Sequence, residues 1–215
     1  WKRWHSCGLC EQDYHGVVHC ALGWAGWKTY VGRPERDWAR RLAMGVLGNG
    51  LYGASHHEDA LVVKEAELSM ERRLGAPEEA MIVTQSNLAN TYQRLGRYEQ
   101  ALRMLRDVYS GRLKLHGEEH EETLRAGNNY AKSLKDLERF KEAKALLRRT
   151  LPVARRVLGE SHELALKMRS LYAAALYRDD AAMPMLDDVR EAVTTLAETA
   201  RTAQRVLGNA HPTTT

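Results

Sequence analysis

Apolar residues in the middle of the chain recur with the spacing of one helix face. One stripe runs through Met81, Leu88, Tyr92 and Leu95, and the next through Tyr98, Ala101, Leu102, Leu105, Val108 and Tyr109. Members of the second stripe lie at i, i+3, i+4, i+7, i+10 and i+11, the period of an amphipathic α-helix. Gly96 separates the stripes and is the residue type that most readily ends a helix. The pattern therefore predicts two helices joined by a tight turn.

This hairpin returns along the chain at a fixed interval. Gly75, Gly117 and Gly159 lie 42 residues apart. The same interval separates Asn87 from Asn129, Tyr98 from Phe140 and Ala101 from Ala143. Such a period is typical of stacked units that bury their apolar faces only against their neighbours. We therefore expect an all-α repeat protein with an extended surface, and surfaces of that kind bind other proteins.

The predicted helices form about four hairpins. First helices are expected near 38–53, 77–95, 119–137 and 161–178, and second helices near 56–74, 97–115, 139–158 and 187–207. The repeats then occupy 38–74, 77–116, 119–158 and 161–208, within a domain at 38–215 that follows a Trp-rich capping helix and linker at 16–37 and a separate segment at 1–15. Because Gly159 and Gly208 are 49 residues apart, a longer loop is expected around residues 179–186.

Residues at the predicted helix ends agree with these limits. The repeat glycines suit the position after a helix, and Ser55-x-x-Glu58 has the form of a capping box. The first predicted helix contains Gly45, Gly48 and Gly50, each of which costs about 1 kcal/mol relative to alanine. We expect close packing against the N-terminal segment to offset that cost.

The composition is that of a folded, water-soluble chain. Of its 215 residues, 44% are hydrophobic and 28% are charged. The longest apolar stretch, residues 16–27, is too short to cross a membrane, and no targeting signal is visible. The net charge is only +4, and many basic residues suit the negative ends of helix dipoles, so nucleic-acid binding is not expected. The chain begins at Trp1 and stops at the start of a further repeat, which suggests a longer protein.

Catalytic chemistry is not expected in the repeats. His120, His162 and His211 each follow a repeat glycine by three residues, so their spacing is structural and they are expected in turns. His-Glu pairs begin at His57, His120 and His162, but a helical zinc protease needs a second histidine four residues after the first, and after each of these pairs that position is leucine. No phosphate-binding glycine loop, nucleophile elbow or dinucleotide fingerprint occurs.

The repeats resemble a known family. The segments 86–92 (Ser-Asn-Leu-Ala-Asn-Thr-Tyr) and 95–102 (Leu-Gly-Arg-Tyr-Glu-Gln-Ala-Leu), followed by a Gly-x-x-His turn, resemble the tetratricopeptide repeats of kinesin light chains. The likeness covers roughly residues 40–211. It implies a right-handed α-solenoid of antiparallel helical hairpins, whose concave side is lined by first helices and takes an extended peptide. Nothing in the chain resembles the coiled coil that joins kinesin light chains to heavy chains.

Polar residues lie beside the apolar stripe of the predicted first helices. Asn87, Asn90 and Arg94 have helical spacing, and Asn129 and Lys132 follow one period later. Asparagine amides can donate to and accept from a peptide backbone. The resemblance implies peptide binding at Asn87 and Asn129. The alternative is that these asparagines are solvated or bridge helices, and the fourth repeat has Leu171 at this position.

The N-terminal block has a different composition. All five tryptophans and all three cysteines lie in the first 38 residues, and the absence of cysteine from the repeats predicts a reducing, cytoplasmic setting. Cys7-x2-Cys10-x4-His15-x4-Cys20 has zinc-knuckle spacing, a four-ligand set compatible with RNA binding. However, residues Val17, Cys20, Ala21, Trp24 and Val31 also form a helical stripe, in which Cys20 would be a small core residue.

A second interpretation of this block comes from another resemblance. Trp4-x-x-Cys7-x-x-Cys10-x-x-x-Tyr14 resembles the end of a RING-variant zinc finger, which implies zinc ligation by Cys7 and Cys10 only. Three functions thus stay open. The leading prediction is a non-enzymatic scaffold that binds a protein or peptide segment. The alternatives are the substrate-adaptor part of a RING-variant ubiquitin ligase and a zinc-knuckle-like RNA-binding module.

Overall fold

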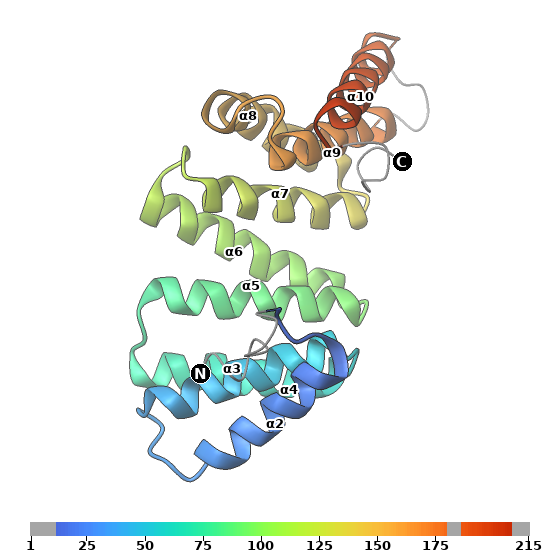
Figure 1. Ribbon diagram of the computed structural model, residues 1–215. Helices are drawn as coiled ribbons and strands as arrows, with labels where there is room; N and C mark the ends of the chain where they lie inside the picture. The colour runs from blue at the N-terminus through green and yellow to red at the C-terminus, as the bar shows by residue number, and fades with distance from the viewer. Residues whose placement is uncertain (1–11, 180–185, 208–215) are drawn as a thin grey trace. The chain divides into compact units, whose positions relative to one another are not determined.

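The computed structural model describes residues 12–179 and 186–207, and all helices and loops discussed below lie in those ranges (Figure 1). The helices are α2 (Gly16–Tyr30), α3 (Trp38–Gly53), α4 (His57–Leu74), α5 (Glu78–Arg94), α6 (Tyr98–His116), α7 (Glu121–Asp136), α8 (Phe140–Leu158), α9 (Glu163–Asp179) and α10 (Leu186–Leu207). From α3 onward, every helix begins and ends within two residues of its predicted limits. None of the described helices is long and apolar enough to cross a membrane. The segment at residues 1–11, His211 and most of the predicted long loop lie outside the described residues.

The chain divides into two compact units, residues 1–104 and 105–215. In the first unit, α2 packs on α3, α3 on α4 and α4 on α5. One apolar cluster joins Cys20 of α2 to Leu47, Leu51 and Ala60 of the next two helices. Another cluster joins α4, α5 and the start of α6 through the buried side chains of Leu61, Leu68, Leu88, Tyr92 and Ala101. Helices α4 and α5 are thus held by their apolar faces, as the periodicity predicts.

Helices α2 and α3 approach each other backbone to backbone. A Cβ atom added to Gly50 would lie 2.8 Å from the Cα of Cys20, and one added to Gly23 would lie 2.9 Å from the Cα of Leu47. Glycine at both positions permits this approach, which confirms the expected close packing for Gly50. Gly45 and Gly48 instead face the side chains of Glu67 and Lys64 on α4.

The predicted face of α2 is wrong. Val17 and Trp24 are exposed, whereas the buried residues of α2 are Cys20, Gly23 and Gly26. Small side chains are buried here because only they leave room for the α3 backbone. The interpretation of Cys20 as a small core residue fits its position in this interface.

A left-handed residue ends several helices. Gly96 has φ +71° after α5, and Glu138 has φ +58° at the equivalent position after α7. In both turns the next backbone N–H bonds to a carbonyl five residues back, Arg97 to Tyr92 and Arg139 to Leu134. Glycine adopts this conformation without strain, whereas glutamate does so at a cost. The second turn therefore keeps the geometry of the repeat without its preferred residue.

The predicted capping box at Ser55 is wrong. Ser55 has φ +66°, and its N–H bonds to the carbonyl of Tyr52, so it closes the end of α3. The N-cap of α4 is His56, whose side chain makes no capping hydrogen bond. The signature fails because the chain needs a left-handed residue after α3, and Ser55 takes that conformation.

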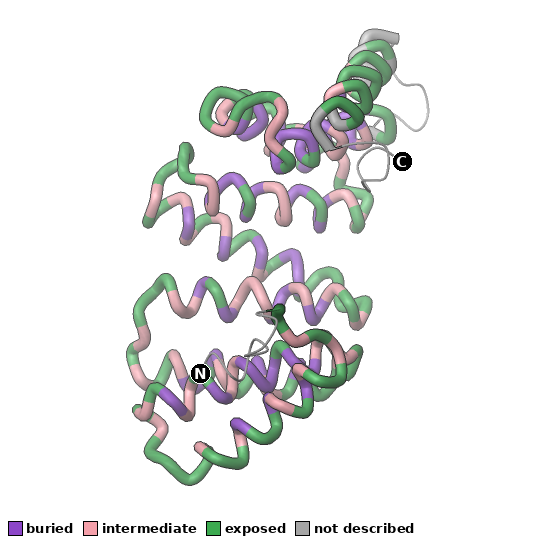
Figure 2. The backbone as a smooth tube through the Cα atoms, viewed as in Figure 1, coloured by how far each residue is buried: buried purple, intermediate pink, exposed green. Residues whose placement is uncertain are grey.

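In the second unit, α7 packs on α8, α8 on α9 and α9 on α10, and α7 also touches α9. Its core contains Leu124, Ala131, Leu147, Leu151, Ala154, Leu164, Met168, Tyr172, Ala173 and Leu176. Figure 2 shows the buried positions alternating with exposed ones along α7 and α8. The contact between α7 and α9 brings the first helices of successive hairpins together, and this pairing positions the cavity described below.

The repeated histidines cap first helices. His120 Nδ1 accepts the N–H of Glu122 at 3.2 Å, and His162 Nδ1 accepts the N–H of Leu164 at 3.3 Å. Each ring thus satisfies one of the backbone donors that a helix N-terminus leaves unpaired. This confirms a structural role for these two histidines.

Candidate functional site

The five predicted binding residues all lie on first helices. Asn87, Asn90 and Arg94 are on α5 in the first unit, and Asn129 and Lys132 are on α7 in the second. The three asparagines are half-buried, whereas Arg94 and Lys132 are exposed. The two groups belong to different units and are therefore described separately.

Arg94 bridges two first helices. Its Nε donates a 3.2 Å hydrogen bond to the hydroxyl of Tyr52 on α3, which lies one full repeat of 42 residues earlier. The interhelical alternative was stated for the asparagines, whereas here the arginine beside them makes such a contact. The rest of its guanidinium stays exposed on the surface of the first unit.

Beneath this bridge lies a buried lysine that the sequence analysis missed. Lys64 of α4 is only 3% exposed, and its Nζ lies 4.7 Å from the centroid of the Tyr52 ring. Nζ also donates to the carbonyl of Asn87 at 3.5 Å and to the hydroxyl of Thr91 at 3.4 Å. The signal in the sequence was its position three residues after Leu61 and four before Leu68, on the apolar stripe of α4. Lys64 thus holds the backbone carbonyl of Asn87 from the buried side of α5.

Burial shifts two ionisable groups of α4 toward their neutral forms. Loss of hydration lowers the pKa of Lys64 to about 8, against the opposing effect of Glu67. Loss of hydration raises the pKa of Glu67 to about 7, with a further contribution from the charge of Glu71. These shifts reflect the burial of both groups inside the helix stack.

In the second unit, a cavity of about 370 Å³ opens between the first helices α7 and α9. Its lining residues are Glu121, Arg125, Asn128 and Asn129 from α7, and His162, Glu163, Leu164 and Lys167 from α9. The predicted residue Asn129 therefore lines a concave surface. Lys132, one turn further along α7, does not line it. This cavity is the best-defined feature among the predicted binding positions.

The charges around this cavity are balanced. Arg125 pairs with Glu121 at 2.5 Å, and Lys167 pairs with Glu163 at 2.5 Å. The side-chain oxygen of Asn128 is buried and makes no hydrogen bond with any described residue. Leaving a buried acceptor unpaired costs about 1–3 kcal/mol. The cavity therefore has no strong field of either sign, and the unpaired acceptor lies in the wall beside it. Asn128 was not among the predicted residues.

The proposed zinc ligands are only partly described. Cys7 and Cys10 lie outside the described residues, His15 is exposed at the start of α2, and Cys20 is buried against α3 and α4. Burial raises the pKa of the Cys20 thiol, which disfavours the thiolate that a metal requires. Within residues 12–179 and 186–207, no three His, Cys, Asp or Glu side chains are placed to hold a metal ion. Zinc binding stays a prediction.

The repeats match a known family over the middle of the chain. Residues 80–154 match the tetratricopeptide repeat family. This range covers most of the two hairpins from α5 to α8, in which the predicted resemblance was best defined. A search of curated proteins finds no match.

Solved structures share the fold at low sequence identity. The tetratricopeptide-like repeats of a Podosopora anserina protein described as a kinesin light chain give a TM-score of 0.71 at 18% identity, over 88% of this chain and 85% of that one. BtubC (BKLC) from P. vanneervenii gives 0.69 at 18% identity, over 90% and 74%. The apo form of RapI gives 0.62 at 13% identity, over 86% and 63%. These likenesses show the fold, and they confirm the predicted all-α solenoid of helical hairpins.

Proposed function

We propose that this chain is a protein-binding scaffold that holds an extended peptide segment against the polar side of its first helices. The cavity between α7 and α9 is the main contact of this proposal. The repeat fold supports it because stacked hairpins offer an extended surface on which another polypeptide can lie. Cavities of about 300–1,000 Å³ are typical of ligand sites, and this one has a volume of about 370 Å³.

The unpaired oxygen of Asn128 is the observation that carries the proposal. If the Asn128 side chain turns its buried oxygen toward the cavity, a peptide N–H there would supply the missing hydrogen bond, so that binding recovers the cost of the buried acceptor. Asn129 beside it can donate to and accept from the same backbone. The paired charges of Arg125 and Lys167 leave no strong preference for a charged side chain. Recognition of main-chain groups is therefore the contribution that this cavity suits.

In this proposal the first unit contributes in a different way. Arg94 is held by Tyr52, and the carbonyl of Asn87 is occupied by Lys64 and Thr91. Only the side chains of Asn87 and Asn90 and the exposed part of Arg94 are then available to a ligand. No described residue favours the ubiquitin-ligase or RNA-binding alternatives, which depend on Cys7 and Cys10. We also propose a cytoplasmic setting on the basis of cysteine usage.

A selection experiment tests this function. Random peptides displayed on phage are selected on the immobilised chain, and the enriched peptides are synthesised with a fluorophore for anisotropy titration. Asn128→Ala should weaken binding by about tenfold or more, because one buried hydrogen bond is lost. The same substitution should leave the free protein as stable as before or more stable, since it removes an unpaired acceptor.

The matched control is Lys141→Ala, which changes an exposed residue on α8 outside the cavity. It should leave the dissociation constant unchanged. If enriched peptides bind Asn128→Ala and Asn129→Ala as tightly as the wild type, this cavity is not the peptide site. If no peptide is enriched over a blank surface, the scaffold function itself is contradicted.

A further inference from the structure

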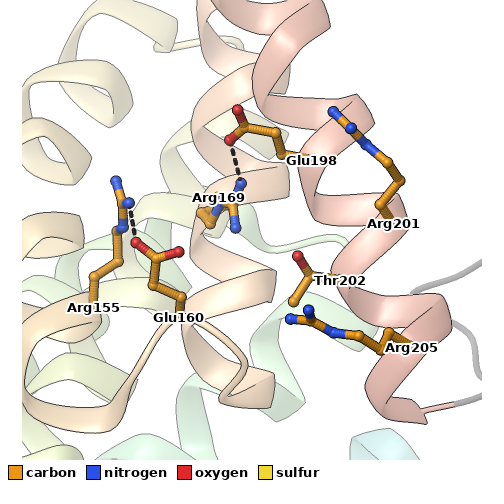
Figure 3. Close-up of a pocket in the computed structure, with 7 residues that line it drawn as sticks. All are labelled: Arg155, Glu160, Arg169, Glu198, Arg201, Thr202 and Arg205. Carbon is orange, nitrogen blue, oxygen red and sulfur yellow. Dashed lines mark hydrogen bonds and ion pairs between the residues drawn. The ribbon is translucent and has the colours of Figure 1, made fainter.

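Four arginines surround a separate cavity at the C-terminal end of the second unit. Its volume is about 600 Å³ (Figure 3). Arg155 comes from the end of α8, Arg169 from α9, and Arg201 and Arg205 from α10. From the sequence, Arg155 and Arg205 were expected only to complement the negative ends of helix dipoles, and no continuous basic stripe is evident. None of them lines the cavity between α7 and α9.

Two carboxylates neutralise part of this charge. Arg169 donates to Glu198 at 3.0 Å, and Arg155 donates to Glu160 in a short contact (Figure 3). The pKa of Glu160 is lowered by its bond to Arg155 and also by the more distant charge of Arg169. With four arginines and two glutamates, the lining keeps a net charge of 4 − 2 = +2.

The other two arginines have no ion pair with any described side chain. Arg201 and Arg205 are exposed and lie one helical turn apart on α10, and only the Nε of Arg201 is engaged, by the carbonyl of Ala197. Their remaining N–H groups can donate to a ligand, as can the hydroxyl of Thr202 between them. Arg169 forms the buried wall opposite, with only 5% of its surface exposed. The cavity thus combines one buried arginine, Arg169, with two exposed arginines, Arg201 and Arg205.

We propose that this cavity binds a phosphomonoester dianion, presented as a phosphorylated serine or threonine of a partner polypeptide. A phosphomonoester carries about −1.5 to −2 charges near neutral pH, which matches the net charge of the lining. Arginine guanidinium groups suit its oxygens, because paired N–H donors bind two oxygens at once.

The composition of the lining selects among phosphate carriers. The described part of the lining contains four arginines, two glutamates and a threonine, so it offers no aromatic ring on which a nucleotide base could stack. These described residues also include no aliphatic side chain to receive a lipid tail. The volume of about 600 Å³ far exceeds that of a bare phosphate ion, which is comparable to a few water molecules of about 30 Å³ each. A phosphorylated side chain with its flanking backbone would fill more of this volume than a free phosphate ion.

Calorimetric titration of the whole chain tests the proposal. The probe is a capped pentapeptide with one phosphoserine between glycines, compared with its serine form and with inorganic phosphate. We expect saturable binding of the phosphopeptide, no binding of the serine form, and weaker binding of inorganic phosphate. The double variant Arg201→Gln with Arg205→Gln should weaken binding by about tenfold or more, because charged hydrogen bonds are lost. Both residues are exposed, so the fold should be retained.

Two further variants distinguish binding at this cavity from general attraction of the phosphopeptide to a positively charged surface. Arg190→Gln removes an exposed charge from the same helix outside the cavity and should leave the affinity unchanged. Glu160→Gln removes an internal competitor for Arg155 and should tighten binding several-fold, a gain that a structural role does not predict.

Equal binding by the wild type and the double arginine variant would overturn the proposal, as would no binding at millimolar phosphopeptide. Inorganic phosphate that binds as tightly as the peptide would overturn the polypeptide source. These outcomes are independent of the peptide proposed for the α7–α9 cavity, since the two sites share no residue.

Discussion

Replacing Gly50 with alanine should loosen the junction between α2 and α3, although alanine is the better helix former. A Cβ at this position would lie 2.8 Å from the Cα of Cys20, 2.9 Å from the carbonyl oxygen of His19 and 3.0 Å from the N of Cys20. Non-bonded carbon atoms normally approach to about 3.5–4.0 Å, so α2 would have to retreat by about 0.7–1.2 Å. All three obstructing atoms belong to the backbone, and no rotamer change can relieve the clash.

The magnitude follows from two opposing effects. Overpacking of a close interface costs about 1–3 kcal/mol, and we expect a value near the upper end because a whole helix must move. Replacing a helical glycine with alanine returns about 1 kcal/mol. The net loss in the free energy of unfolding should therefore be about 2 kcal/mol.

Gly53 provides the matched control in the same helix. A Cβ added there would lie no closer than 3.9 Å to the nearest atom, the N of Gly16, which is ordinary contact. Gly53→Ala should therefore be neutral or stabilising by up to about 1 kcal/mol. The two glycine-to-alanine changes are expected to have opposite signs, although they make the same change in sequence three residues apart.

Tryptophan fluorescence during urea unfolding is the appropriate assay. All five tryptophans lie in the first 38 residues, and Trp27 packs against the cluster around Cys20 and Leu47. Fluorescence therefore reports mainly on this end of the chain, while circular dichroism at 222 nm follows all helices. With a typical urea slope of about 1–3 kcal/mol per molar, the midpoint for Gly50→Ala should fall by about 1 M. A Gly50→Ala midpoint equal to or above that of Gly53→Ala would refute the backbone-contact argument.

Three other predictions concern stability, pH and metal. Glu138→Gly should raise the free energy of unfolding by about 1 kcal/mol in urea titration, because glycine relieves the left-handed φ of +58°, whereas Glu138→Ala should give no gain. The raised pKa of Glu67, about 7 instead of 4.5, means that the wild type loses stability as this carboxyl ionises between those pH values. Glu67→Gln should thus match the wild type near pH 4 and exceed it by about 3 kcal/mol near pH 8, and equal stabilities at both pH values would contradict the burial argument. Zinc measured by atomic emission should be about one ion per chain and be lost in Cys7→Ser with Cys10→Ser, so equal content in both proteins would remove the metal hypothesis.

Much of the fold was predictable because its signals are local. The positions of α5 and α6 follow from one stripe of apolar residues each, and the turn between them follows from Gly96. Capping by His120 and His162 follows from their fixed place after the repeat glycines. The predicted capping box failed because Ser55 closes the end of α3, where its N–H bonds to the carbonyl of Tyr52. It is therefore not the N-cap of α4.

The sites were less predictable. Asn129 was found from its polar position beside an apolar stripe, but Asn128, whose oxygen lies unpaired next to it, has no distinguishing pattern. Lys64 was missed because an isolated lysine is normally solvated, and here partners from other helices compensate its burial, among them the ring of Tyr52, the carbonyl of Asn87 and the hydroxyl of Thr91. Arg155 and Arg205 meet at one cavity although 50 residues separate them in sequence.

The sequence by itself determined the repeat period, the helix limits and the class of fold, because these depend on residues within a few turns of one another. Only the tertiary structure decided which face of α2 is buried, which polar groups stay unpaired and where arginines from three helices converge. The physical reason is that burial, desolvation and summed charge depend on distances between elements. Local spacing alone does not specify those distances.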